Sequence, residues 1–467
     1  MTMDFGKRTP ASETTPAAPQ SAAMTLPAST VQDPAAPRPF HSDSGMSSDL
    51  IRDEVLLRIE PAVAIRMTKE ELAARVIELV AEIANEHRLL LNWQEQRALS
   101  DVIVDDMVGL GPLESLLRDD TVSDILVNGA YMVYVERHGK LELTSVRFRN
   151  NAHVLHVAQR IASAIGRRVD ESSPILDARL ADGSRVNVII PPLSIKGPAL
   201  SIRKFSKSAM SFASFVKYGT VSPAMSRALE IAARCRLNII ISGGTGSGKT
   251  TLLNALSSTI DPTERIVTIE DTAELQLQQP HVVQLETRTA NIEGTGQVTQ
   301  GDLLRNALRM RPDRIILGEV RGPEAFDMMQ AMNTGHDGSM STVHANSGRD
   351  ALSRIENMIL MAAVNLPMQA IRGQMVSALD LIVQTARMRD GVRRVTEIVE
   401  VVGLEGEVFS LETLFVYRFT GQDTDGTLRG NFESSNVRPR FLPRLEYFGL
   451  AAAFMAALTL TPDHAEG

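Results

Sequence analysis

The sequence predicts an α/β protein whose largest domain is a parallel, helix-covered sheet, preceded by an α+β domain and a small helical bundle. Three observations carry this prediction. In the second half of the chain, short apolar runs alternate with amphipathic segments, which is typical of parallel sheets. One of these runs leads directly into the glycine-rich segment GGTGSGKT at 243–250. Upstream, the spacing of apolar residues is first helical and then strand-like.

The composition limits the class of protein. With 467 residues, of which 43% are hydrophobic, the chain is long enough for several domains with ordinary cores. The formal net charge of −8 and the aromatic content of 4% argue against a nucleic-acid coat and against a base-stacking platform. A single cysteine, Cys235, excludes a disulfide framework and a four-cysteine zinc site.

No export signal or membrane span is predicted. The first 20 residues contain no apolar run of the kind that a signal peptide needs. The most apolar stretch, 448–460, is too short to cross a bilayer as a helix. We therefore expect a cytoplasmic protein that reaches membranes through its partners.

The N-terminal part predicts a tail followed by helices. Residues 1–48 hold seven of the 22 prolines and almost no large apolar residues, so we expect a disordered tail. Residues 49–108 predict a helical bundle, in which Thr68 and Glu71 form a capping box at the start of one helix. The apolar face of that helix is expected to be Leu72, Val76, Leu79, Val80 and Ile83.

Residues 109–205 predict a small α+β domain. A hairpin is expected around Asn128 and Gly129, because this turn pair separates two strand-like runs. The predicted elements, in order, are strands at 125–129 and 131–137, a helix near 151–165, and strands at 185–190 and 199–205. The segment 206–223 is expected to be a hinge.

Residues 224–420 predict the domain with the parallel sheet, followed by a C-terminal extension at 421–467, and we assign no role to the run after Leu450. The expected strands are 237–242, 265–270, 314–319, 339–344 and 381–386, with a helix near 249–259. Two further helices are expected to begin at the pairs Thr299/Asp302 and Ser347/Asp350, which have the spacing of a capping box.

The segment 243–250 matches a phosphate-binding loop in full and lies, as required, between an apolar strand and a helix. Its glycines let backbone N–H groups approach phosphate oxygens, and the helix N-terminus adds partial positive charge. Lys249 is expected to reach the β- and γ-phosphates of ATP, and the Thr250 hydroxyl to bind Mg2+. A glycine-rich turn with an incidental lysine is the alternative, which the two flanks disfavour. The predicted nucleotide-binding residues are Gly243, Gly244, Thr245, Gly246, Ser247, Gly248, Lys249, Thr250 and Thr251.

Two predicted strands end in carboxylates, which ATP hydrolysis needs to orient water and to hold the metal. We assign Glu270 as the general base and Glu319 as the residue that governs Mg2+ and water, although the two roles could be exchanged. Both residues, with Thr250, are predicted metal ligands. Gly318 stands where an aspartate often precedes such a glutamate, so Mg2+ would be held partly through water. The alternative is that both are solvated acids at strand ends.

Two histidines, His336 and His344, lie on either side of a predicted strand. A zinc site is a poor interpretation, because no cysteine and no closely spaced histidine pair accompanies them. A γ-phosphate sensor that contacts the nucleotide or a neighbouring subunit is the sharper hypothesis for these histidines, with His344 assigned to the site, and a structural histidine is the alternative.

Taken together, these motifs resemble one family, the ATPases of secretion systems and pilus motors. GGTGSGKTT resembles its Walker A motif, TIEDTAEL its Asp box, and RIILGEVRG with TGHDGSMSTVHANS its Walker B motif and His box. The resemblance covers about residues 50–445. The late segments RRVTEIVEVVG and VRPRFLPRLEYFGL are similar to the CpaF type, the ATPase of Tad/Flp pilus assembly.

The resemblance implies a RecA-like P-loop NTPase domain in a homohexameric ring at the cytoplasmic face of the inner membrane. It implies an enzyme that hydrolyses ATP to ADP and phosphate, and that drives pilus assembly or secretion through inner-membrane platform proteins. No specific nucleic-acid partner is expected. Arg185 and Arg203 match the family's N-terminal arginines, which reach the phosphates as the domains close. With Lys249, Glu270, Glu319 and His344 they complete the predicted catalytic set.

Three other functions stay open. The same motor could move protein or DNA through a secretion or conjugation channel. A RecA-like helicase or recombinase is disfavoured by the acidic balance and the few aromatic residues. A nucleotide-gated scaffold that does not hydrolyse ATP would require Glu270 and Glu319 to be idle.

Overall fold

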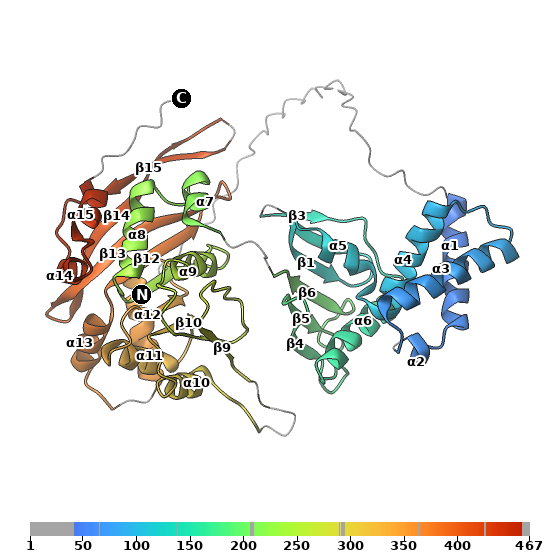
Figure 1. Cartoon of the computed structure of the whole chain (residues 1–467), viewed down its shortest axis with the longest axis horizontal. Coiled ribbons are helices and arrows are strands. Elements are labelled where there is room, and N and C mark those ends of the chain that lie inside the picture. Colours follow the sequence, from blue (N-terminus) through green and yellow to red (C-terminus); the bar gives the residue numbers. More distant parts are fainter. Residues whose placement is uncertain are drawn as a thin grey trace, which may run out of the picture. The chain divides into compact units, whose positions relative to one another are not determined.

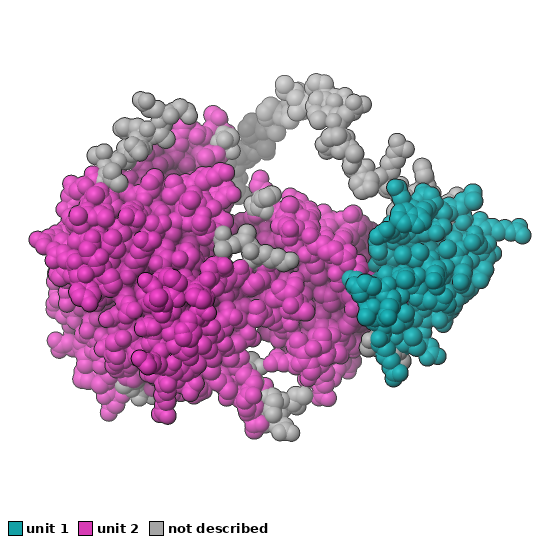
Figure 2. Space-filling view, in the orientation of Figure 1, with its two compact units in different colours: residues 1–104 teal, residues 105–467 magenta. Residues whose placement is uncertain are grey.

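The computed structural model describes residues 42–459 except 65, 138, 206–209, 289, 291–294, 363–364 and 425. The chain divides into two compact units, residues 1–104 and residues 105–467 (Figure 2). The division falls within helix α4 (Trp93–Val108), a few residues before the boundary predicted at 108. Residues 1–41, which make up most of the predicted tail, lie outside the described residues.

The first unit is helical (Figure 1). Its helices are α1 (Ser42–Arg58), α2 (Pro61–Ala64), α3 (Lys69–Glu86) and most of α4. The predicted tail extends to residue 48, whereas α1 already begins at Ser42. The predicted capping box is present, since the Glu71 N–H donates to Thr68 Oγ1 at 3.2 Å and the Thr68 N–H donates to Glu71 Oε2 at 2.9 Å. The apolar face predicted for α3 is buried along its whole length.

A group of ion pairs joins α1 to the end of α3. Arg58 donates to Glu54 at 2.9 Å and to Glu86 at 2.5 Å, and His87 Nε2 lies 2.6 Å from Glu54 Oε1. Glu54, Glu86 and His87 present ligand atoms within metal-binding reach of one another. The Arg58 guanidinium already supplies the positive charge between these carboxylates, so the group acts as an ion-pair network.

The second unit begins with a six-stranded antiparallel sheet in the order β3-β2-β1-β6-β5-β4, here called the six-stranded domain (residues 105–205). The predicted hairpin around Asn128 and Gly129 is present as β1 and β2. The elements are η1 (Gly111–Leu113), α5 (Glu114–Arg118), β1 (Val122–Asn128), β2 (Val133–Arg137), β3 (Lys140–Leu143), α6 (Asn151–Ala164), β4 (Ile175–Arg179), β5 (Arg185–Ile189) and β6 (Ala199–Arg203).

The register of this sheet places two predicted site residues side by side. Arg185, the first residue of β5, pairs directly with Arg203, the last residue of β6. On the other side of β6, Arg203 pairs with Asp124 of β1. Alternate residues of β5 and β6 are buried in the core of the domain, so the two arginines lie on the opposite, open face.

The rest of the second unit, here called the nine-stranded domain (residues 210–459), is built on one mixed sheet in the order β15-β14-β13-β12-β7-β11-β10-β8-β9. Its strands are β7 (Ile239–Gly243), β8 (Ile266–Glu270), β9 (Val282–Glu286), β10 (Arg314–Val320), β11 (Met340–Val343), β12 (Leu381–Arg387), β13 (Arg393–Glu405), β14 (Val408–Gln422) and β15 (Leu428–Ser434). The five predicted strands, which are β7, β8, β10, β11 and β12, are parallel to one another, and β9 adds a sixth parallel strand. The sequence analysis did not predict β13 to β15, which continue the sheet as an antiparallel meander.

Helices cover both faces of the parallel part of this sheet. They are α7 (Phe212–Lys217), α8 (Pro223–Arg234), α9 (Lys249–Ser257), α10 (Gln300–Ala307), α11 (Glu324–Asn333), α12 (Gly348–Met361), α13 (Met368–Ala378), α14 (Leu442–Tyr447) and α15 (Ala451–Thr459). Along β7, Ile239 and Ile241 belong to the core beneath α8, α9 and α15, whereas Ile240 belongs to the core beneath α10 to α13. Both faces of the strand are therefore buried, which explains its unbroken apolar sequence.

Two helix starts follow the predicted pairs. Thr299 and Asp302 form a reciprocal capping box at α10. Ser347 accepts the Asp350 N–H at α12, but the Asp350 carboxylate accepts the N–H of Asn346 instead of that of Ser347. The predicted hinge at 206–223 contains α7, whose Phe212 and Phe215 are buried in the core beneath α8. Residues 206–209 of the predicted hinge lie outside the described residues, and α7 itself is packed into the nine-stranded domain.

The C-terminal apolar run is part of the core. Phe454 of α15 is 1% exposed and packs edge to face on Phe441, with ring centroids 5.4 Å apart. Ala457 and Leu458 of the same helix are also buried beside α8. Within residues 42–459 that the structure describes, no helix combines the length and the apolar character needed to span a membrane.

Replacing Phe454 by alanine should destabilise the nine-stranded domain by about 3–5 kcal/mol, because it opens a cavity between α15 and α8. The melting temperature of the protein should fall by several degrees. Tyr447→Ala is the matched control, since this aromatic side chain is 86% exposed. Equal melting temperatures for the two variants would show that α15 does not contribute to the core.

Candidate active site

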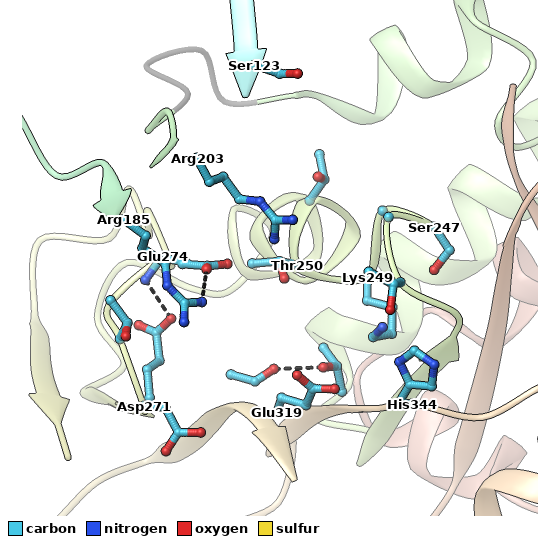
Figure 3. A pocket seen from close by; sticks show the side chains of 18 of the residues that line it. Ser123, Arg185, Arg203, Ser247, Lys249, Thr250, Asp271, Glu274, Glu319 and His344 are labelled. Carbon is cyan, nitrogen blue, oxygen red and sulfur yellow. Dashed lines mark hydrogen bonds and ion pairs between the residues drawn. The ribbon is translucent and has the colours of Figure 1, made fainter. Parts of the chain in front are cut away.

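The carboxyl ends of parallel strands bring most of the predicted site residues to one cavity of about 510 Å³. Figure 3 shows Arg185, Arg203, Lys249, Thr250, Glu319 and His344 arranged around this space. The predicted residues that line it are Arg185, Arg203, Thr245, Gly246, Ser247, Gly248, Lys249, Thr250, Thr251, Glu270, Glu319 and His344. Gly243 and Gly244 belong to the loop but do not line the cavity. His336 lies before β11, at the opposite end of the sheet, with Nδ1 3.2 Å from the Ala331 carbonyl.

The glycine-rich loop connects β7 to α9. Gly246 and Gly248 have φ angles of +70° and +96°, which residues other than glycine rarely adopt. Lys249 is the first residue of α9, and its Nζ donates to the carbonyls of Gly243 at 2.9 Å and Gly244 at 3.1 Å. Burial lowers the pKa of this lysine, and the nearby Glu319 carboxylate opposes that shift.

Residues from β12 and β13 hold the loop from outside, and the sequence analysis missed them. The Thr385 and Ser247 hydroxyls are 2.8 Å apart, and Arg393 Nε donates to the Gly246 carbonyl at 2.9 Å. Arg387 also lines the cavity. Their position in the sequence could have indicated them. The arginines in TARMRDGVRR follow the predicted strand 381–386 at its carboxyl end, where ligands bind in parallel sheets.

Glu270 ends β8 with its carboxylate buried, and the residue is 3% exposed. Its Oε2 accepts the N–H groups of Glu274 at 2.8 Å and Leu275 at 3.0 Å, whereas Oε1 has no partner among the described residues. Burial raises the pKa of Glu270 to about 7, and the charges of Glu274 and Glu286 add to the shift. A carboxylate that exchanges its proton near neutral pH suits a general base.

The position of Glu270 explains why residue 318 is a glycine. A Cβ atom on Gly318 would lie 2.9 Å from the Glu270 Cγ, which is closer than carbon atoms can approach. The Glu270 side chain therefore fills the space that an aspartate at position 318 would need. The two strand-end acids are Glu270 on β8 and Glu319 on β10, which are adjacent strands of the sheet.

Glu319 lies at the mouth of the cavity and is held by Arg321. Its Oε2 accepts from Arg321 Nε at 3.0 Å and from Arg321 Nη2 at 2.5 Å. The Thr250 hydroxyl, the Glu319 carboxylate and the unpartnered Oε1 of Glu270 are hard oxygen ligands around one space. This donor set fits Mg2+, which prefers a few protein oxygens together with water and phosphate.

Both predicted arginines reach the cavity, and each has an acidic partner that the sequence analysis did not single out. Arg185 Nη1 donates to Glu274 Oε1 at 2.5 Å. Arg203 Nε donates to Asp124 Oδ1 at 3.3 Å. Glu274 belongs to the TIEDTAEL segment, which the sequence analysis did identify. The segment alone does not indicate that Arg185 is the partner of Glu274.

Comparison with known proteins gives concordant matches. Residues 106–402 match the family model described as "Type II/IV secretion system protein". A putative conjugal transfer protein of Mycobacterium tuberculosis is 39% identical over 313 residues, which is 66% of this chain and 88% of that protein. The conjugal transfer protein TrbB of Rhizobium radiobacter is 35% identical over 300 residues, covering 63% and 88% respectively. The crystal structure of the VirB11 ATPase of the Brucella suis type IV secretion system, in complex with sulphate, is 28% identical with a TM-score of 0.34, covering 62% of this chain and 95% of that one.

The burial of Glu270 makes the stability of the protein depend on pH. Because the folded pKa of about 7 lies above the ordinary 4.5, the folded state favours the protonated carboxyl, and stability falls as pH rises from about 4.5 to about 7. Glu270→Gln keeps an oxygen for the two N–H groups but cannot ionise. It should therefore stabilise the protein by up to about 3 kcal/mol at pH 8 and have little effect at pH 5.

Thermal unfolding of the wild type and the Glu270→Gln variant without nucleotide, at pH 5 and pH 8, measures this difference in stability. Glu433→Gln, on the surface of the β14–β15 hairpin, serves as the control for removing a negative charge. A stabilisation by Glu270→Gln that is the same at pH 5 and pH 8 would contradict the buried, proton-exchanging carboxyl.

Proposed function

The chain belongs to the type II/IV secretion system protein family and is a P-loop enzyme that hydrolyses ATP, and on this premise we propose that it is the motor of a secretion or conjugation machine that moves protein or DNA across a cell envelope. One observation carries the choice of machine. Relatives named as conjugal transfer proteins match this chain at 35% and 39% identity over 88% of their own length. The cavity supports the motor itself, since it unites the phosphate loop with the strand-end acids.

Assembly of a Tad/Flp-type pilus is the second candidate. The late segments RRVTEIVEVVG and VRPRFLPRLEYFGL resemble the CpaF type, and they form most of β13 and the whole of α14 with its flanks. The residues of the cavity do not separate the two candidates, because both machines would use the same ATP hydrolysis.

We assign the chemistry to the residues of the cavity as follows. The N–H groups of the loop and Lys249 bind the β- and γ-phosphates, and Lys249 exchanges its two loop carbonyls for phosphate oxygens. Thr250 and Glu319 hold Mg2+, which would neutralise phosphate charge when it is bound. Glu270 accepts the proton of the attacking water at Oε1, the oxygen that has no other partner.

Three further side chains act on the γ-phosphate in this proposal. Arg185 and Arg203 reach it from the open face of the six-stranded sheet and stabilise the charge that develops during transfer. His344 follows β11 at the same end of the sheet and senses the γ-phosphate. Their separate origins mean that the complete site forms only when the two sheets come together.

We further propose that six copies form a ring at the cytoplasmic face of the inner membrane and act on platform proteins embedded there. ATP binding draws the six-stranded domain toward the phosphates, and release lets it move back. In this proposal the segment 206–223 supplies the hinge, because a hinge absorbs backbone rotation at few positions.

Lys249→Ala should lower ATP turnover at least about a hundredfold, because the phosphates lose the cation that neutralises them. The melting temperature should change little, since the hydrogen bonds of Lys249 among the described residues go to two loop carbonyls. Phosphate release by the purified full-length protein, with Lys217→Ala as an exposed-lysine control, measures the effect. Unchanged turnover in the Lys249 variant would end the mechanism drawn here.

Replacing the native allele by the Lys249→Ala allele tests the choice of machine. We expect loss of conjugal transfer or protein export while surface pili persist, because hydrolysis powers only the channel in the proposal. Transfer frequency, secreted protein and pili are counted in the same strain, with the Lys217→Ala allele as the control. Loss of pili with export intact would favour the second candidate instead.

A further inference from the structure

The ion pair between Arg185 and Glu274 joins the two sheets of the second unit. Arg185 begins β5 of the six-stranded sheet, and Glu274 follows β8 of the nine-stranded sheet. Their charged atoms are 2.5 Å apart, and the side chains are 40% and 29% exposed. Both residues line the cavity that holds the phosphate loop (Figure 3).

The pair of Arg203 with Asp124 has a different consequence. These residues lie directly opposite each other on β6 and β1, and their contact is longer, at 3.3 Å. Both residues belong to the six-stranded sheet, so this pair does not join the two domains. Among the described residues, the Arg185 pair is the one that ties a predicted phosphate-contacting arginine to the opposite domain.

The ion pair between Arg185 and Glu274 affects anion binding because of the charges that line the cavity. Seven basic and six acidic side chains line the cavity, so its cations are almost balanced by its own carboxylates. A triphosphate that approaches Arg185 meets the Glu274 carboxylate beside it, and two like charges at this range repel each other. The phosphate and Glu274 therefore compete for one guanidinium.

Glu274 is also connected to the proposed base. Its own N–H and that of Leu275 are the two donors that hold Glu270 Oε2, at 2.8 and 3.0 Å. A change in the partner of the Glu274 side chain therefore acts on the short segment that positions Glu270.

We propose that Glu274 is a positioning residue that holds Arg185 at the cavity until a triphosphate displaces it, and that this exchange lowers the affinity for ATP. The inference rests on the proposed function. Glu274 sets the affinity because its charge must be left unpaired, beside the phosphates, each time ATP binds.

The test measures the affinity of the full-length protein for MgATPγS, by competition with a ribose-labelled fluorescent ATP. Glu274→Gln should bind it about twofold to fivefold more tightly than the wild type, the range expected for removing a partly exposed ion pair. Glu274→Asp keeps the negative charge and should stay within about twofold of the wild type. A residue that only maintained the fold would weaken binding when replaced.

A second background identifies Arg185 as the partner. Arg185→Ala protein has no guanidinium for which Glu274 and the phosphate could compete. Adding Glu274→Gln to this protein should therefore raise the affinity clearly less than it does in the wild type. The remaining gain is no more than the loss of one repulsive charge gives. Glu433→Gln is the matched control, because it also releases an arginine, Arg418, from an ion pair outside the cavity. Its affinity should equal that of the wild type.

The outcomes separate this inference from the proposed function. Wild-type protein that binds no MgATPγS would overturn both. Wild-type protein that binds it, together with a Glu274→Gln variant of equal or weaker affinity and normal melting temperature, would overturn the role of Glu274 and leave the motor intact. An equal gain in the presence and absence of Arg185 would likewise exclude the exchange.

Discussion

The site depends on one buried interaction, the pair of hydrogen bonds from the N–H groups of Glu274 and Leu275 to Glu270 Oε2. Without them a carboxylate at the end of a fully buried strand would be too costly to keep. They compensate one oxygen and leave the other unpartnered within the described residues. They also fix the side chain against residue 318, which must then be glycine. These two hydrogen bonds therefore position the proposed base Glu270, account for glycine instead of aspartate at position 318, and connect the base to the segment that holds Arg185.

The charged groups of the cavity are paired in a similar way. Lys249 is bonded to loop carbonyls, Arg321 to Glu319 and Arg185 to Glu274, so each strong cation already has an oxygen partner. Binding of a nucleotide is then an exchange of partners instead of a capture by free charge. Exchange moderates affinity, and a motor that must release its product in every cycle needs moderate affinity.

Local signals predicted the part of the site that is local in sequence. The phosphate loop, the capping boxes and Glu270 at its strand end could be located because a motif or a period of two or 3.6 residues marks each. The partners Glu274 and Arg185 are 89 positions apart, and their contact arises only when two sheets meet. The meander β13–β15 escaped because its long strands are half polar and carry register shifts, so neither a clean alternation nor a continuous apolar run marks them.

The sequence analysis assigned no role to the apolar C-terminal run, because a local pattern does not tell which surface the run covers. In the structure, α15 packs into the core beside α8. The preceding helix α14 continues the connection, because Arg444 donates to Asp380 at 2.8 Å, and the same carboxylate accepts the N–H of Asn238 at 2.8 Å. Asn238 immediately precedes β7, the strand that carries the phosphate loop. The last helices of the chain therefore fix the amino end of the strand whose carboxyl end binds phosphate, and the position of the loop rests on residues some 200 positions downstream of it.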